Sequence, residues 1–334
     1  MNLQKNMKTK YLLLAIAVAV LLMLAFLPQF TSRYTISLII LGFIFAIFAM
    51  SLDLLTGYLG HSSLGHAAFF GTAAYVLAIV DTRLGWGFFK SVPFALAFTV
   101  AVALIFGLLV ARISGVQFLL VNLALAQVVW GVAYRWCSMT GGDNGIVGVS
   151  RPVIGSLSFK GPNYYYFVLA VFVISSVLLY LLVNSPFGQT MRGIRQSQSR
   201  MRVLGYNVWL HKYITYVISA FFAGVAGILW AYFNNYVGPT DVAIITSSKA
   251  LLMVLAGGSG TLFGPMIGGF LVVFMENLIS ARTDRWVIFL GAMYVIVVIF
   301  LPGGVFGLVK NIASFAKQLV TKKEVGCPVK REDL

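Results

Sequence analysis

The sequence predicts an all-α polytopic membrane protein with about ten transmembrane helices. Apolar residues make up 60% of the 334 residues and charged residues only 10%, a composition outside the range of water-soluble domains. Apolar stretches of about 18 residues or more recur along the chain, which is the length needed to cross the hydrocarbon core of a bilayer. These stretches are continuous and do not alternate with period two, which disfavours a β-barrel.

Hydropathy places ten helices along the chain. The first follows Lys5, Lys8 and Lys10, and we interpret it as a retained helix, because its core is long for a signal peptide and no A-x-A cleavage pattern follows. Two of the ten, near 64–80 and 244–257, are short enough to be partly re-entrant. The predicted spans are 11–28, 36–56, 64–80, 91–111, 116–134, 163–183, 213–234, 244–257, 262–281 and 286–301.

The distribution of basic residues predicts the orientation of these spans. With the N-terminus in the cytoplasm, 15 of the 24 Lys and Arg residues fall in inner segments and eight in outer loops, as the positive-inside rule expects. Ten spans then place both termini in the cytoplasm, with tails at 1–10 and 304–334 and a transmembrane domain at 11–303. The net charge of +15 is explained by this orientation and by attraction to anionic membrane lipid. No motif indicates a nucleic-acid partner.

Two glycine-rich segments interrupt apolar helices, one in each half of the chain. GYLGHSSLGHAAFFGTAAY begins at Gly57 and GGSGTLFGPMIGG begins at Gly257. Paired breaks of this kind are typical of internal repeats around a translocation path, although small residues also serve close helix packing. The candidate path residues are Asp53, Gly57, Gly60, His61, Gly65, His66, Lys249, Gly257, Gly258, Gly260, Gly264 and Pro265.

Three charged residues lie within the predicted spans: Asp53, Lys249 and Glu276. A charge at the bilayer centre costs at least about 2.5 kcal/mol on insertion scales, so each is expected to face protein or water. Because Asp53 and Lys249 precede the two glycine-rich segments by similar distances, we hypothesise that they form an ion pair across the repeat axis.

Neither a metal site nor a cofactor site is predicted. His61 and His66 lack the spacing of a zinc-binding helix. The glycine-rich GGSGTLFGP lacks the Lys-Ser/Thr of a phosphate-binding loop. Scattered intramembrane charges also do not form the convergent cluster that an enzyme requires.

A cationic segment at 184–212 holds four arginines, one lysine, one histidine and no acid. Pro186 ends the preceding helix, and one amphipathic helix is expected from Gln189 to Leu204, ended by Gly205. Its arginines meet either lipid phosphates or the rim of a cleft in a soluble partner. The candidate docking residues are Pro186, Gly188, Arg192, Ile194, Arg195, Arg202, Leu204 and Gly205.

Four motifs in order resemble those of LivM-type permeases, the membrane subunits of ABC importers for branched-chain amino acids. LDLLTGYLGHSSLGHAAFFGTAAY is similar to the family's N-L-L-x-G-Y-x-G-Q-x-S-L-G-H-A-A-F-x-G-x-G-A-Y. TGGDNGIVGVSRP resembles its external loop, and LLMVLAGGSGTLFGPMIGG resembles its L-G-G-x-G-[ST]-x-x-G-P signature. SPFG, Ile194-Arg195 and Leu204-Gly205 match its cytoplasmic coupling loop. The resemblance covers nearly the whole chain.

The resemblance implies a non-catalytic permease domain at 11–303 in the bacterial cytoplasmic membrane, working by alternating access. The implied partners are ATP-binding subunits that hydrolyse ATP, a second related permease forming a heterodimer, and a periplasmic or lipoprotein substrate-binding protein that delivers ligand near the outer loop 135–162. The implied substrates are branched-chain or related hydrophobic amino acids. Relatives also carry urea or short-chain amides.

Several residues depart from the family pattern. Asp53 stands in place of a usual Asn, His61 in place of a usual Gln, and Lys249 where relatives often carry Glu. Because these positions lie near the implied path, they leave the substrate open. An ion-coupled secondary transporter that uses Asp53 or Glu276 remains the alternative from a different class.

Overall fold

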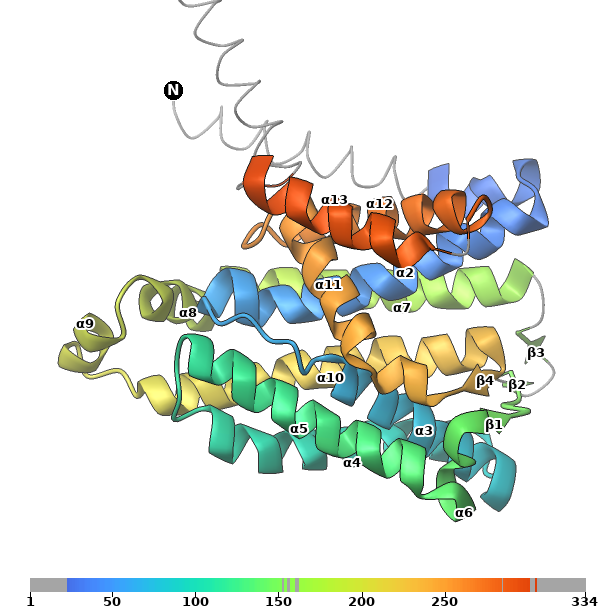
Figure 1. The fold of residues 1–334 in the computed structure, drawn as a ribbon, viewed down its shortest axis with the longest axis horizontal. Helices are drawn as coiled ribbons and strands as arrows, with labels where there is room; N and C mark the ends of the chain where they lie inside the picture. The colour runs from blue at the N-terminus through green and yellow to red at the C-terminus, as the bar shows by residue number, and fades with distance from the viewer. Residues whose placement is uncertain are drawn as a thin grey trace, which may run out of the picture.

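The computed structural model describes residues 23–151, 153–154, 157–159, 162–283, 285–300 and 304, and these are mostly helical. Figure 1 shows long helices lying side by side along the longest axis of the molecule. Seven helices in the described residues are long and apolar enough to cross a membrane. They are Arg33–Leu59, Ala67–Leu84, Phe88–Val110, Val116–Arg135, Asn163–Asn184, Val208–Asn234 and Phe263–Ser280.

The elements follow the predicted order closely. The long helices are α2 (Arg33–Asp53, continued by the π-helix η1, Leu54–Leu59), α3 (Ala67–Leu84), α4 (Phe88–Val110), α5 (Val116–Arg135), α7 (Pro162–Asn184), α10 (Val208–Asn234), α11 (Ile244–Gly257), α12 (Phe263–Ser280) and α13 (Trp286–Phe300). The short elements are α6 (Cys137–Thr140), η2 (Gly142–Asn144), β1 (Ile146–Val147), β2 (Val153–Ile154), β3 (Leu157–Ser158), α8 (Pro186–Gln196), α9 (Gln198–Val203), β4 (Tyr236–Val237) and η3 (Pro239–Val242).

The helix α2 forms the centre of the fold. It contacts α7, α10, α11 and α12, and almost every residue from Leu38 to Asp53 is buried. A helix that is apolar on all sides is stable only when protein or lipid surrounds it, and here protein does. The hydroxyl of Ser32 caps its first turn by accepting a hydrogen bond from the Thr35 amide.

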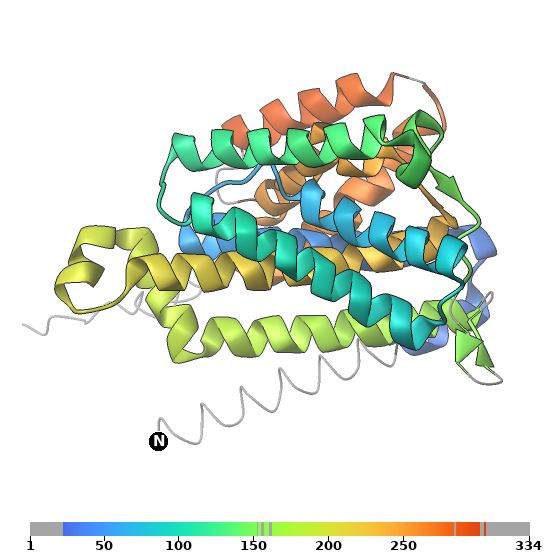
Figure 2. The same cartoon turned by 90° about the horizontal axis from the view of Figure 1, so that it is seen from below.

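The two ends of the molecule differ in character. In both views α8 and α9 project beyond one end of the long helices (Figures 1 and 2). At the opposite end lie α6 and two small antiparallel sheets, in which β1 pairs with β4 and β2 with β3. The cationic segment and the predicted outer loop at 135–162 therefore lie at opposite ends, as the charge distribution predicts.

The helix breaks predicted in the glycine-rich segments are confirmed. Residues 60–66 and 258–262 are not helical, and the first of these stretches runs back from the α8–α9 end towards the middle of the molecule (Figure 1). Most of it is buried, which agrees with the rule that irregular backbone at membrane depth needs protein around it. Of the first predicted span, residues 23–28 are helical, in a helix that continues to residue 30, and the rest lies outside the described residues.

The prediction of one continuous helix from Gln189 to Leu204 is wrong. Ser197 has extended backbone angles (φ −164°, ψ 109°) and separates α8 from α9. Its hydroxyl accepts a hydrogen bond from the Arg200 amide at 3.3 Å, so the serine caps the second helix. Ser favours such caps because its oxygen replaces a missing backbone acceptor.

Candidate functional site

The two glycine-rich segments meet at the α8–α9 end of the fold. A Cβ atom added at Gly57 would lie 2.2 Å from the backbone nitrogen of Gly260, so no larger residue fits without moving one backbone. Gly260 also has a φ of +81°, a conformation that glycine adopts without strain. We call the set Asp53, Gly57, Gly60, Arg195 and Gly260 the glycine crossing.

Asp53 fastens this crossing from the side of α2. Its carboxylate is fully buried and accepts hydrogen bonds from the backbone nitrogens of Gly260 at 2.8 Å and Leu262 at 3.4 Å. Two backbone donors satisfy this carboxylate, because burying it without hydrogen bonds would be very unfavourable. The hypothesised ion pair between Asp53 and Lys249 is therefore wrong.

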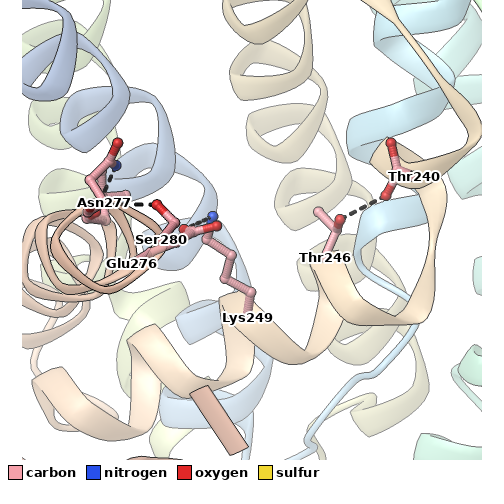
Figure 3. A network of polar contacts seen from close by, with 7 residues as sticks. Thr240, Thr246, Lys249, Glu276, Asn277 and Ser280 are labelled. Carbon is pink, nitrogen blue, oxygen red and sulfur yellow. Dashed lines mark hydrogen bonds and ion pairs between the residues drawn. The ribbon is translucent and has the colours of Figure 1, made fainter. Parts of the chain in front are cut away.

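Lys249 pairs instead with Glu276. The lysine lies on α11 and its ammonium reaches the glutamate carboxylate on α12 (Figure 3). The same ammonium lies 4.2 Å from the centre of the Phe45 ring on α2, within the range of a cation–π contact. The reason for the different pairing is the packing of α11 against α12, which places the two opposite charges side by side.

The other predicted path glycines mainly allow close backbone packing. A Cβ atom at Gly257 would lie 1.9 Å from the Gly264 carbonyl oxygen, and one at Gly65 would lie 2.2 Å from the Asn122 carbonyl oxygen. Gly258 ends α11 with a φ of +111°. At these positions the contacts favour the packing alternative over a glycine-lined path. Pro265 is buried in the first turn of α12.

The two predicted path histidines have separate surroundings. His66 is fully buried, and its Nε2 lies 2.8 Å from the Ser51 hydroxyl. His61 stacks on Phe118 with 5.0 Å between ring centres, and its Nε2 lies 3.3 Å from the Gln198 amide nitrogen. Burial, together with the nearby Lys212, lowers the pKa of His61 to about 4, so its ring is neutral at cytoplasmic pH. Within the described residues no group of His, Cys, Asp and Glu could hold a metal ion.

Both arginines of α8 contact η1, and Arg195 is at the same time exposed. Arg195 donates a hydrogen bond to the Gly57 carbonyl oxygen, and the Arg192 guanidinium lies 5.2 Å from the centre of the Tyr58 ring. Ile194 is buried beside them. Pro186 begins the helix, with its N-cap at Ser185. Packing of α8 against η1 thus connects both arginines to the long helices.

Further exposed side chains of the cationic segment, both cationic and apolar, lie on α9 and in the turn after it. Arg200 and Arg202 are exposed, and the apolar side chains of Val203 and Leu204 are 87% and 69% exposed. Gly205 follows with a φ of +85°, as expected for the end of a helix. Between α8 and α9 is a groove of about 540 Å³, lined by Asn184, Pro186, Gln189, Thr190, Gly193, Met201, Leu204 and Tyr206.

Sequence reasoning missed two residues that tie the cationic segment to the fold, Gln198 and Lys212. Gln198 contacts His61, and Lys212 donates hydrogen bonds to the Ile113 carbonyl oxygen and, at 2.9 Å, to the Ser114 hydroxyl. A Cβ atom added at Gly188 would lie 2.1 Å from the Val183 carbonyl oxygen. This candidate docking residue therefore has a packing role, which its backbone flexibility alone did not indicate. The sequence did contain a signal for Glu276 as the partner of Lys249, because it was the third charged residue within the predicted spans.

The fold and this site together define the class of protein to which the chain belongs. The chain is a multi-pass α-helical protein of the cytoplasmic membrane, and its buried helix breaks, joined to an exposed cationic loop, are typical of transport permeases. Residues 34–298 match the family described as branched-chain amino acid transport system / permease component. The chain belongs to this family.

Named relatives agree with the family. The high-affinity branched-chain amino acid transport system permease protein LivM of Escherichia coli K12 is 26% identical over 88% of this chain and 75% of its own length. The corresponding protein BraD of Pseudomonas aeruginosa is 22% identical over 80% of this chain and 92% of its own length. LivH of Escherichia coli K12 is 28% identical over 42% of this chain and 46% of its own length. No solved structure matches the chain.

Proposed function

We propose that this chain is the permease subunit of an ATP-driven importer and translocates branched-chain or related hydrophobic amino acids. The observation that carries the proposal is the physical connection between the projecting α8–α9 unit and the glycine crossing, through Arg195 and Gly57. Such a connection suits a protein in which a soluble motor moves helix breaks inside the membrane. The names of the relatives support the substrate class.

In this proposal the chain has ten spans, with both termini in the cytoplasm and the loop 184–212 facing ATP-binding subunits. The permease domain is 11–303, and the tails are 1–10 and 304–334. The opposite placement of α8–α9 and of the small sheets supports this topology (Figure 1). A substrate-binding protein then meets the end that holds α6 and the sheets, and a second related permease completes the path.

The ATP-binding subunit docks on α9 and the groove beside it. Arg200 and Arg202 flank the exposed apolar pair Val203 and Leu204, and the segment 184–212 contains no acid. A partner with an apolar cleft and an acidic rim complements this surface, with the apolar contact at its centre and the charges at its edge.

Transport involves no chemistry on the substrate. ATP hydrolysis takes place on the partner subunits, and the permease alternates between an outward-facing and an inward-facing state that the partners stabilise differently. Among the described residues, the two acids available for ion coupling are already engaged, Asp53 with backbone donors and Glu276 with Lys249. These contacts favour an ATP-driven importer over an ion-coupled transporter.

The test is purification of the tagged protein from its native membrane in mild detergent, followed by uptake assays. We expect an ATP-binding subunit and a second permease to accompany it, and ATP inside proteoliposomes to drive uptake of labelled leucine when the binding protein is present. Uptake of urea or acetamide instead of leucine would keep the mechanism and change the substrate. Uptake by this chain alone, driven by a proton or sodium gradient, would refute the proposal.

Docking on α9 is tested by Arg200→Ala combined with Arg202→Ala. We expect the double variant to recover less ATP-binding subunit at a given salt concentration, because rim charges steer association and are screened by salt. The matched control is Arg135→Ala, an exposed arginine at the opposite end of the molecule, which should recover the normal amount. Equal recovery from the double variant and from wild type would exclude this docking surface.

A further inference from the structure

Arg195 fills the space beside three glycines from the two glycine-rich segments. Its side chain leaves α8 and donates a hydrogen bond to the Gly57 carbonyl oxygen in η1. Its Cγ lies 2.8 Å from where a Cβ of Gly60 would stand, and its Nη1 lies 3.0 Å from where a Cβ of Gly260 would stand. One guanidinium therefore touches both glycine-rich segments at the point where they cross.

Asp53 holds the same crossing from the opposite side. Its carboxylate binds the backbone nitrogens of Gly260 and Leu262, so the stretch 258–262 is fastened to α2. The connection of the crossing to α8, in contrast, is the hydrogen bond from Arg195 to the Gly57 carbonyl oxygen. A movement of α8 thus reaches the helix break in the second half of the chain by way of η1.

The segment η1 is suited to change its helical geometry under such a movement. Residues Leu54–Leu59 form a π-helix that ends at Gly60 with a φ of +80°. π-helical turns are rare, occur mostly as single turns inside α-helices and are frequent at functional sites. Returning one such turn to α-helical geometry shifts the residues that follow by one position, about 100° around the axis and 1.5 Å along it. Gly57 lies within this turn and Gly60 directly follows it.

We infer that Arg195 is a positioning residue that transmits the movement of α8 to the glycine crossing, opening and closing the contact between Gly57 and Gly260. The inference rests on the proposed function, in which ATP-binding subunits move α8. Arg192 also reaches η1, where it lies over the ring of Tyr58, but Arg195 is the α8 arginine that lies beside both Gly57 and Gly260. Arg202 is on α9.

The experiment compares substrate transported with ATP hydrolysed, using the complete complex in proteoliposomes with its binding protein. For Arg195→Gln we expect ATP hydrolysis close to wild type and about a tenfold fall in substrate transported per ATP, within the usual range of coupling effects. Arg195→Lys retains a donor for the Gly57 carbonyl oxygen and should give an intermediate ratio. Arg112→Gln, at an exposed arginine between α4 and α5, is the control and should keep the wild-type ratio.

The outcomes separate this inference from the proposed function. If wild type shows no ATP-driven uptake, the proposed function fails. If wild type is active and Arg195→Gln transports as much per ATP as wild type, the inference alone is overturned. Should Arg195→Gln fail to assemble, Arg195→Lys is compared with Arg192→Lys. A lower ratio only in Arg195→Lys supports the inference, and equal ratios overturn it.

Discussion

Replacing Lys249 by Met removes the cation from the ion pair with Glu276 and leaves the rest of α11 unchanged. The two side chains are only 11% and 19% exposed, so Glu276 would keep its charge in an apolar region with little water. Breaking a buried pair by removing one partner costs about 3–5 kcal/mol. The partial exposure of the glutamate places the expected loss near the lower figure, about 3 kcal/mol, or roughly a hundredfold in the folding equilibrium.

The pair predicts a specific pattern of rescue. Lys249→Met combined with Glu276→Gln removes the remaining charge and should recover most of the lost stability. The charge swap, Lys249→Glu with Glu276→Lys, restores the attraction but moves the cation away from the Phe45 ring, 4.2 Å from the present ammonium. Its recovery should fall short by about 1 kcal/mol, the size of a partly desolvated cation–π contact.

Equilibrium unfolding of the purified permease in mixed micelles measures these differences as a double-mutant cycle. Lys90→Met is the control, because this lysine is exposed in the first turn of α4 and should change stability little. The reasoning is refuted if Lys249→Met is as stable as Lys90→Met, or if neither double variant is more stable than Lys249→Met alone.

Three further predictions follow from single sites. Asp53→Asn keeps one oxygen, which can accept from the Gly260 amide at the shorter of the two hydrogen bonds, and should retain much of the uptake. Asp53→Leu leaves both backbone amides unsatisfied, at about 1–3 kcal/mol each, and should lose it; loss of uptake in both would mean that the charge itself is needed. Gly257→Ala brings a methyl group to 1.9 Å from the Gly264 carbonyl oxygen and should sharply lower the yield of folded protein on size-exclusion chromatography, while Gly131→Ala, which meets nothing within 4 Å, should not. Burial raises the pKa of Asp241 from 3.8 to about 6, so the folded state binds its proton more tightly; this contribution to stability is full below about pH 4 and is lost as the pH rises through about 6. Thermal unfolding between these pH values should show a steeper fall of stability with rising pH in wild type than in Asp241→Asn.

Local patterns were enough to place most of the helices. The span predicted at 244–257 coincides with α11, because the bilayer and the glycines that follow both limit it. The break between α7 and α8 follows from Pro186, which has no amide hydrogen and a fixed φ, and therefore starts a helix readily but does not continue one. The break at Ser197 was not predicted, since Ser is tolerated inside helices and caps them only when the chain turns there.

Contacts between distant segments were harder to predict. The sequence suggested that Asp53 and Lys249 face each other, because their positions in the two halves are similar. In the structure the Asp53 carboxylate accepts hydrogen bonds from backbone amides of the stretch 258–262. The packing of α11 on α12 places Lys249 beside Glu276, with which it forms an ion pair. Either intramembrane acid could pair with Lys249, so spacing along the chain did not decide between them.

The sequence by itself determined that this chain spans a membrane several times and where its helices break at glycine. These properties depend on hydropathy and local backbone freedom, which neighbouring residues set. Only the tertiary structure decided that Arg192 and Arg195 contact η1 and that Gly57 meets Gly260. Such contacts depend on how whole helices pack, because a side chain's partner is chosen by the element brought against it.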